Sequence, residues 1–278
     1  MNASKASRQM TSVSRMLGLA ALLASLMIVG CVTVTSGDHD EDGASDESQK
    51  HSYEVGENPV IDVTGFNGSI EIITGADGEV DIETTLRVPS KISYSATYDG
   101  NKVTIIAKRI GNGISIGRSP SAEIHLVVPE QAMILAKTSN GSISVDGVIG
   151  DGELKTSNGK IVITESEGTY VASTSNGRIT MDDVVGQFRA ETSNGGIDFS
   201  GTFTENSSNK LSTSNGSINI ELDSDPSVSL DAKASNGKTI SELPILATTT
   251  EQSHLVGKFG DGSAELEVRT SNGSVTIK

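Results

Sequence analysis

A short motif, Thr-Ser-Asn-Gly, recurs through the second half of this chain at nearly constant spacing. Its copies begin at Thr138, Thr156, Thr174, Thr192, Thr213 and Thr270, with a variant, Ala-Ser-Asn-Gly, at Ala234. Consecutive copies are separated by 18, 18, 18, 21, 21 and 36 residues. We interpret the last interval as two periods in which the middle copy has been lost. The chain is therefore predicted to consist of structurally equivalent units of about 18 residues.

Apolar residues occupy fixed positions relative to the asparagine of each copy. The third position after it holds Ile143, Ile161, Ile179, Ile197, Ile218, Thr239 and Val275, and the fifth holds Val145, Ile163, Met181, Phe199, Ile220, Ser241 and Ile277. The residue between these two positions is polar in most copies. Alternation of period two predicts a strand with one buried face after each motif. The Asn-Gly pair before this strand tolerates a positive φ, which tight corners often require.

Strands that follow a repeated corner can be arranged in two ways. Antiparallel hairpins would give a meander or a barrel. In a parallel β-solenoid, each unit is one coil, and equivalent residues on adjacent coils lie about 4.8 Å apart. We favour the solenoid, because stacked coils explain why all four positions of the motif are the same in every copy but the Ala234 variant. Stacking also lets each Asn side chain hydrogen-bond to the next. The predicted ladder contains Asn140, Asn158, Asn176, Asn194, Asn215, Asn236 and Asn272.

The fold prediction is a single all-β domain over residues 53–278, a parallel, β-helix-like solenoid with coils of about 18 residues. Only 3% of the residues are aromatic, which indicates a thin aliphatic core. Less regular coils are expected toward the N-terminus, where Val63, Asn67 and Gly68 match the columns and Asn112-Gly113 indicates another corner. Such irregular coils would cap the first edge of the stack.

The first 30 residues have the pattern of a secretory signal peptide. Lys5, Arg8 and Arg15 precede an apolar stretch from Met16 to Met27 that is short for a transmembrane helix. The stretch ends in Ile-Val-Gly-Cys31, which resembles the lipobox of bacterial lipoproteins.

In lipoproteins, the cysteine of the lipobox receives a diacylglycerol, and its new amino group is acylated, typically with palmitate. Several acyl chains at one point anchor a protein almost permanently. Cys31 is the only cysteine of the chain, so it is predicted to carry the lipid. The alternatives are a secreted protein with a chance cysteine and a retained signal anchor. Val32 stands where the related sorting pattern places Asp for retention at the inner membrane, which favours the outer membrane of a bacterial envelope.

Residues 31–52 are predicted to form a disordered acidic tether after the lipid. Between Ser36 and Gln49 there is no branched apolar residue, so the segment cannot bury enough surface to offset its chain entropy. The acids and His39 could bind a divalent cation loosely, but a solvated linker is the simpler interpretation. The whole chain has 36 acidic and 21 basic side chains, a net charge of -15 that makes a nucleic-acid partner improbable.

The run from Leu126 to Pro129 is followed by Ala-Lys-Thr-Ser-Asn-Gly-Ser-Ile-Ser-Val145 and its repeats. Together they resemble a bacterial family of domains of unknown function that carries the label "putative adhesin". The resemblance extends from about Val60 to Lys278. It implies a repetitive β fold and a place in the cell envelope, and it brings no catalytic residues to transfer to this chain.

Acidic side chains follow the corners without forming an evident catalytic group. Asp146, Asp182 and Glu221 stand six residues after their corner asparagines, alternating with Thr164 and Ser200. A polysaccharide lyase or hydrolase would concentrate acids on neighbouring coils together with a basic partner. The four histidines, His39, His51, His125 and His254, are scattered through the chain. We therefore predict no catalytic site, no metal site and no cofactor, and we interpret the acids as a solvated face.

Basic residues beside the corners are the weaker candidates for a binding surface. They are Lys137, Lys155, Lys160 and Arg178, which could meet an anionic glycan or a lipid phosphate, although interleaved charge on a solvated face is the simpler interpretation. The leading hypothesis is a non-enzymatic, lipid-anchored envelope protein whose solenoid serves adhesion or scaffolding, with a glycan, peptidoglycan or envelope protein as partner. The alternatives are a β-helix enzyme acting on polysaccharide and an accessory regulator of the envelope stress response.

Overall fold

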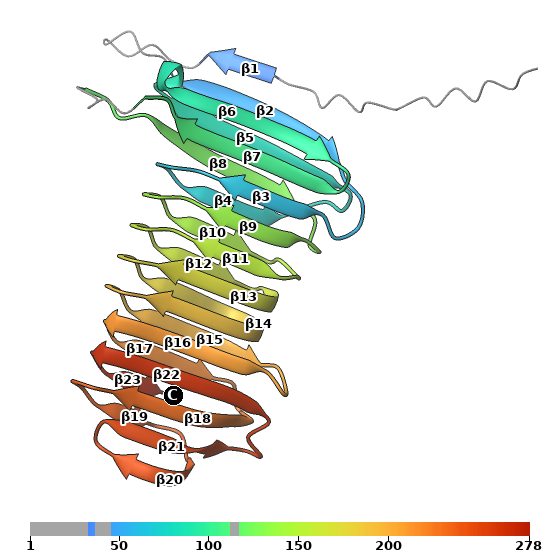
Figure 1. The fold of residues 1–278 in the computed structure, drawn as a ribbon. Helices are drawn as coiled ribbons and strands as arrows, with labels where there is room; N and C mark the ends of the chain where they lie inside the picture. Colours follow the sequence, from blue (N-terminus) through green and yellow to red (C-terminus); the bar gives the residue numbers. More distant parts are fainter. Residues whose placement is uncertain (1–32, 37–45, 112–116) are drawn as a thin grey trace, which may run out of the picture.

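A computed structural model describes residues 33–36, 46–111 and 117–278. The strands stack along one axis into a rod, and the described residues contain a single helical turn, the 3-10 turn η1 (Pro89–Lys91) (Figure 1). Through the middle of the rod, neighbouring strands pair in parallel. The all-β parallel solenoid predicted from the repeat is confirmed.

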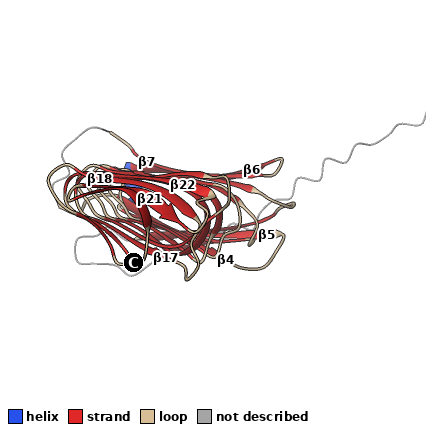
Figure 2. Ribbon diagram, turned by 90° about the horizontal axis from the view of Figure 1, so that it is seen from below, coloured by secondary structure: helices blue, strands red, loops and turns tan. Residues whose placement is uncertain are grey.

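The 23 strands of the described residues belong to one hydrogen-bonded sheet that wraps around the core as two main faces. Seen along the stack, the two faces form two layers of strands (Figure 2). The first face contains, in spatial order, β6 (Ile92–Asp99), β7 (Lys102–Arg109), β3 (Val60–Thr64), β9 (Met133–Lys137), β11 (Gly152–Lys155), β13 (Glu167–Thr174), the end of β14 (Ile179–Thr192), β16 (Ser208–Asn215), β22 (Ala264–Asn272), β18 (Val228–Ala234), β21 (His254–Phe259) and β20 (Leu246–Glu251).

The second face is joined to the first by the corners and the returns of each coil. It contains, in spatial order, β1 (Thr33–Ser36), β2 (Glu47–Glu54), β5 (Glu79–Arg87), β8 (Ser121–Val128), β4 (Ile70–Thr74), β10 (Ile143–Asp146), β12 (Ile161–Thr164), the start of β14, β15 (Ile197–Phe203), β17 (Ile218–Leu222), β23 (Val275–Ile277) and β19 (Thr239–Ser241).

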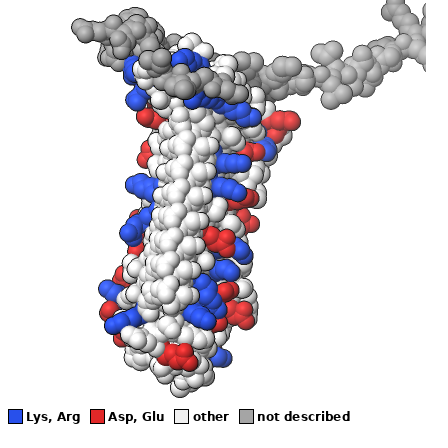
Figure 3. Space-filling model, turned by 60° about the vertical axis from the view of Figure 1, so that its left-hand side comes forward, with Lys and Arg blue, Asp and Glu red and all other residues white. Residues whose placement is uncertain are grey.

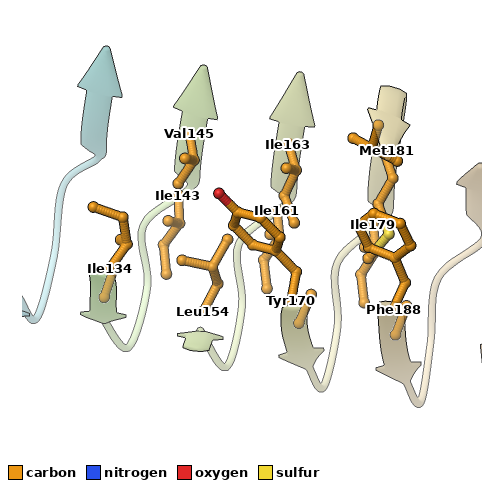
Figure 4. Packing of buried hydrophobic residues seen from close by; sticks show 14 of the residues in the cluster. Ile134, Ile143, Val145, Leu154, Ile161, Ile163, Tyr170, Ile179, Met181 and Phe188 are labelled. Carbon is orange, nitrogen blue, oxygen red and sulfur yellow. The ribbon is translucent and has the colours of Figure 1, made fainter. Parts of the chain in front are cut away.

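The apolar columns read from the sequence are true columns of the structure. Ile143 pairs with Ile161, and Ile161 pairs with Ile179, each on the adjacent coil. All three side chains are fully buried, and they point between the two faces (Figure 4). The alternation of buried and exposed residues along each strand therefore has the physical origin that the sequence predicts: one side of every strand contacts the core.

The core also contains aromatic rings, of which the sequence columns reveal only Phe199. Tyr170 and Phe188 are fully buried and stack on adjacent coils with their ring centroids 6.3 Å apart. Phe188 contacts Phe199 edge-on at 5.5 Å, and Phe199 stacks on Phe203 at 4.4 Å. Burial raises the pKa of Tyr170 to about 12, and its hydroxyl donates a hydrogen bond to a backbone carbonyl. Aromatic rings also contribute at the N-terminal side, where Tyr53 is in the core and stacks on Tyr98 at 5.8 Å.

The N-terminal end of the rod is built from antiparallel strands. β5 pairs antiparallel with both β2 and β8, and β6 pairs antiparallel with β7. The first regular coil in sequence order, β3 and β4, lies inside this cap, between β7 and β8 on one side and β9 and β10 on the other. The prediction of irregular capping coils is confirmed, except that the corner expected at Asn112-Gly113 lies outside the described residues.

The tether predicted for residues 31–52 overlaps two strands. Residues 47–52 belong to β2, whose whole length pairs with β5, and residues 33–36 form β1 on the outer edge of β2. The boundary of the predicted solenoid at residue 53 therefore needs correction, since the domain includes Glu47. The composition of this segment is polar because β2 is close to the end of the stack, where one strand face contacts little core.

The C-terminal end corrects the interpretation of the 36-residue interval. The interval does not contain a lost corner. After β19, the chain forms the antiparallel pair β20 and β21, and β21 pairs antiparallel with β18. The chain then returns, and β22 inserts between β16 and β18. The last segment of the sequence is therefore an interior coil of the rod (Figure 1).

Candidate functional site

The corner asparagines form one continuous hydrogen-bonded ladder along the rod. Each side-chain amide donates to the side-chain oxygen of the asparagine on the preceding coil, over distances of 2.7 to 3.0 Å. In spatial order, the ladder contains Asn67, Asn140, Asn158, Asn176, Asn194, Asn215, Asn272 and Asn236. The predicted ladder is confirmed, with its last two members exchanged and Asn67 added.

Glycine follows each asparagine because adjacent corners pack backbone against backbone. A Cβ atom on Gly159 would lie 1.8 Å from the carbonyl oxygen of Gly141, and one on Gly177 would lie 1.8 Å from the carbonyl oxygen of Gly159. These glycines are not among the residues with positive φ, whereas Gly68 in the first corner has a φ of 99°. The prediction of a positive φ at the repeated corners is wrong: the requirement is for close approach between coils.

The threonine of most copies of the motif also connects neighbouring coils. Its side chain is buried, and in Thr156, Thr174 and Thr192 the hydroxyl donates to the carbonyl of the glycine on the preceding coil at 2.9 to 3.0 Å. The serine and asparagine side chains are left on the outside. The corner thus presents a column of exposed hydroxyl and amide groups whose inner side is fixed by hydrogen bonds.

Two rows of residues flank this column, one on each face of the rod. On the first face, the row three positions before each asparagine contains Thr64, Lys137, Lys155, Ser173, Glu191, Ser212, Arg269 and Lys233, in spatial order. On the other face, the row two positions after each asparagine contains Ser69, Ser142, Lys160, Arg178, Gly196, Ser217, Ser274 and Lys238.

The two rows carry seven basic residues and one acid, Glu191, although the chain as a whole has 36 acids and 21 bases. Figure 3 shows the uncharged column with basic residues on both sides of it. The four binding candidates of the sequence analysis, Lys137, Lys155, Lys160 and Arg178, all lie in these rows. The structure places them on both sides of the column of stacked corners, the surface that the sequence analysis proposed. The bases of the C-terminal coils were missed, because their neighbours in space are not their neighbours in sequence.

Only some of these basic residues form ion pairs. Arg178 contacts Asp198, and Arg269 pairs with Asp231 at 2.7 Å. Within residues 46–111 and 117–278, no ion pair is formed by Lys137, Lys155, Lys160, Lys233 or Lys238. All five are exposed.

A shallow groove of about 410 Å³ lies beside the column on the first face. Its lining is rich in hydroxyls and contains Lys155, Thr156, Ser157, Ser173, Thr174, Ser175, Glu191, Thr192, Ser193, Lys210 and Ser212. Within the groove, Glu191 pairs with Arg189 at 2.7 Å, and Lys210 pairs with Glu267 at 3.6 Å. Lys155 is the groove residue whose charge no described neighbour compensates.

The acids singled out from the sequence, Asp146, Asp182 and Glu221, lie outside this groove. Asp182 and Glu221 line a different hollow of about 380 Å³, with Asp198 and Lys278. The part of the chain that the structure describes holds no group of three His, Cys, Asp or Glu side chains arranged to bind a metal ion. Cys31 and His39 lie outside the described residues.

A second charged cluster, missed by sequence reasoning, joins three strands of the C-terminal end. Asp231 on β18 accepts hydrogen bonds from Arg269 on β22 at 2.7 and 3.1 Å, and it contacts Nε2 of His254 on β21 at 2.9 Å. Arg269 also pairs with Glu267 at 3.4 Å. The hydrogen bond from Arg269, followed by that from His254, lowers the pKa of the Asp231 carboxyl. The cluster connects the inserted strand β22 to β18 and β21, and Asp231 and Arg269 also line a hollow of about 380 Å³.

The other two described histidines contact side chains on neighbouring strands or on their own strand. His125 on β8 contacts Glu71 on β4 at 3.2 Å. His51 stacks on Tyr53 at the N-terminal end of the rod with ring centroids 6.2 Å apart, and partial burial lowers the pKa of its imidazole. Neither histidine lies beside the corner column, so the binding candidates remain the flanking bases.

The repeat region is recognised by a family model. Residues 130–278, more than half of the chain, match Toastrack DUF4097. The chain belongs to the Toastrack DUF4097 family. This match confirms the resemblance found from the Thr-Ser-Asn-Gly repeats, including the absence of an established function for the family.

Solved structures similar to this Toastrack chain share little sequence with it. A putative cell adhesion protein from Clostridium sporogenes ATCC 15579 is 12% identical, with 83% of this chain and 99% of that chain covered and a TM-score of 0.36. For a putative adhesin from Bacteroides fragilis NCTC 9343, the identity is 11%, the covered shares are 83% and 97%, and the TM-score is 0.42. A putative lipid binding protein from Parabacteroides distasonis ATCC 8503 is 12% identical, with 83% of this chain and 97% of that chain covered and a TM-score of 0.39. No curated protein matches the chain significantly. Among the described residues there is no helix with the length and hydropathy of a membrane span.

Proposed function

We propose that this Toastrack chain is a non-enzymatic protein of the bacterial cell envelope, anchored by acylated Cys31 in the outer membrane. Its solenoid offers a long polar surface for adhesion or scaffolding. The observation that supports this role most directly is the exposed corner column with its excess of bases, which runs along a rod of stacked coils (Figure 3). The signal peptide, the lipobox resemblance and the position of the only cysteine support the anchor.

A rigid rod suits this role for a physical reason. The Asn ladder, the Thr hydrogen bonds and the backbone contacts at the glycines fix every corner relative to the next. Side chains on such a column are held in place before any partner binds, so less ordering entropy is lost on association. A partner with its own repeat could then contact several coils at once, and the many weak contacts would add up.

Fractionation of cells that produce the full-length chain tests the anchor. We expect the wild type in the outer-membrane fraction and the Cys31→Ser variant in the soluble periplasmic or secreted fraction. Cys31 is the only cysteine, so incorporation of labelled palmitate should also disappear in the variant. Recovery of Cys31→Ser with the membrane, or of a wild type without lipid, would contradict the proposed anchor.

Binding tests the surface role separately. The purified Cys31→Ser chain is mixed with isolated envelopes and with peptidoglycan, and bound protein is measured after sedimentation. We expect saturable binding with no release of reducing or unsaturated sugar ends. Release of such ends would replace this proposal with a polysaccharide-active enzyme, and absence of binding to every envelope fraction would remove the adhesion role.

A further inference from the structure

Lys137 and Lys155 form an unusual pair of charges. They are directly paired residues on the adjacent parallel strands β9 and β11, so their backbones are about 4.8 Å apart. The next residues in this row are Thr64 on one side and Ser173 on the other, and neither can neutralise a cation. Like charges placed opposite each other destabilise a sheet. A chain with 36 acids has many side chains that could have compensated this pair, yet none of the described acids does.

A third uncompensated cation completes the patch. Lys160 follows the corner of the coil that carries Lys155, and it lies on the other side of the column, in the same row as Ser142 and Arg178. The three lysines are exposed and surround the hydroxyl and amide groups of the Asn140 and Asn158 corners. Positive charge is therefore concentrated over two coils of a molecule that is otherwise strongly acidic.

The groove beside the column extends this patch along the rod. It starts at Lys155 and continues over the serine hydroxyls of the next coils, while its other charged residues, Glu191 and Lys210, are already paired with Arg189 and Glu267. The groove thus combines one unpaired cation with a row of hydrogen-bonding groups that repeat once per coil. Such a lining suits a flexible chain of hydroxyl-bearing units with negative charges at intervals.

We infer that the corner column between the Asn140 and Asn194 coils binds an anionic polysaccharide, whose carboxylates or phosphates contact Lys137, Lys155 and Lys160. Its sugar hydroxyls hydrogen-bond to the serine side chains of the groove. This inference rests on the proposed surface role and names the class of partner for it. A polymer is favoured over a lipid headgroup because the groove is elongated and polar, with no apolar side chain in its lining to receive an acyl chain.

The test uses the purified Cys31→Ser chain and polygalacturonate, a linear polymer with one carboxylate per sugar. Binding is measured by titration calorimetry, with neutral dextran and anionic phosphatidylglycerol vesicles as further ligands. We expect binding to polygalacturonate that weakens when the ionic strength is raised from about 0.1 M to about 1 M, and no binding to dextran. Equal binding to dextran would overturn the role of charge, and binding to the vesicles alone would replace the polymer by a lipid surface.

Charge-matched variants locate the site. The patch variant is Lys137→Gln/Lys155→Gln/Lys160→Gln. The control removes the same total charge from exposed lysines at the other side of the coils, away from the corner column, as Lys102→Gln/Lys258→Gln/Lys278→Gln. We expect the patch variant to lose affinity by about tenfold or more, because three exposed charged contacts each contribute up to about 1 kcal/mol. The control should stay within about twofold.

Equal losses in the two variants would show that net charge alone governs binding, and the inference would fail. Both variants change exposed side chains only, and their thermal unfolding is compared with that of the parent to confirm that they fold. If the chain sediments with envelopes or peptidoglycan but does not bind polygalacturonate, the inference about the partner is wrong while the surface role stands.

Discussion

The middle of the rod and its C-terminal end use the same corner motif with different chain paths. From Asn140 to Asn215, each coil stacks on the one that precedes it in sequence. At the C-terminal end, the coil of Asn272 lies between those of Asn215 and Asn236. The motif therefore specifies how two coils stack, and it does not specify which two coils become neighbours.

The difference arises from the open edges of a solenoid. A parallel stack leaves unpaired backbone groups on its last coil, which other chains could pair with. This protein places antiparallel strands there: β18 is covered by β21, and β21 by β20. The chain must then return. The returning strands β22 and β23 pair on both sides with coils that precede them in sequence. The Asp231, His254 and Arg269 cluster exists only in this rearranged part.

The largest expected effect is a loss of stability that differs between the middle and the C-terminal end of the rod. It compares two substitutions in the same apolar column. Ile161→Asp places a charge without a partner in the fully buried middle of the core, and we expect it to lower the free energy of unfolding by about 4 kcal/mol or more. Thr239→Asp changes the same column on the outermost coil, where the residue is half-buried, and should cost about 1 kcal/mol or less. Urea unfolding followed by circular dichroism measures both, and similar losses would show that the outermost coil is packed as tightly as the middle.

A smaller effect is expected from the corner glycines. In Gly177→Ala, the new methyl group would lie 1.8 Å from the carbonyl oxygen of Gly159, and coils on both sides prevent either backbone from moving away. We expect a loss of about 2 kcal/mol. In Gly237→Ala, the same distance of 1.8 Å separates the methyl group from the carbonyl oxygen of Gly273.

The Gly237 corner is the last of the ladder, and on its outer side the residues that flank it, Ala234 and Thr239, donate hydrogen bonds to the β20–β21 turn instead of to another corner. We expect a single turn at the end of the stack to shift more easily than a coil packed between two others. The expected loss there is below about 1 kcal/mol. Thermal unfolding of the two variants measures the difference. An equal loss at both glycines would mean that the terminal corner is as constrained as an interior one.

The smallest effect concerns the charge cluster and depends on pH. The pKa of Asp231 is lowered in the folded chain, so its ionised form stabilises the fold above about pH 5, and this contribution disappears as the pH falls through the unfolded pKa toward the folded one. Asp231→Asn should lower stability at pH 7 by no more than about 1 kcal/mol, because the side chain is 46% exposed and screened by solvent.

Below about pH 4, the difference between Asp231→Asn and the wild type should become smaller. Hydrogen exchange of β22 against that of β11 shows where the stability is lost. Equal loss in both strands would contradict a cluster that acts only at the C-terminal end, and a difference that does not depend on pH would contradict the role of the carboxylate charge.

Much of the fold could be predicted from particular residues. The columns of Ile143, Ile161 and Ile179 gave the strands and their buried faces, and the asparagines gave the ladder, because both patterns repeat with the coil itself. The four basic candidates were found for the same reason. The Asp231 cluster could not be found, since its three members come from strands that the repeat predicts to be in separate coils.

The coil could be predicted from the repeat alone, including its length, its corner, its inward and outward positions, and the parallel stacking of like residues. These follow from local periodicity, which acts between a residue and its neighbours along the strand and is present in every unit. Long-range pairing established three features that the repeat does not contain: the order of the coils at the two ends, the inclusion of Glu47 to Ser52 in the sheet, and the meeting of bases from distant segments on one surface. The physical reason is that equivalent edges can pair with any equivalent edge, so the covering of the last open strands selects among them.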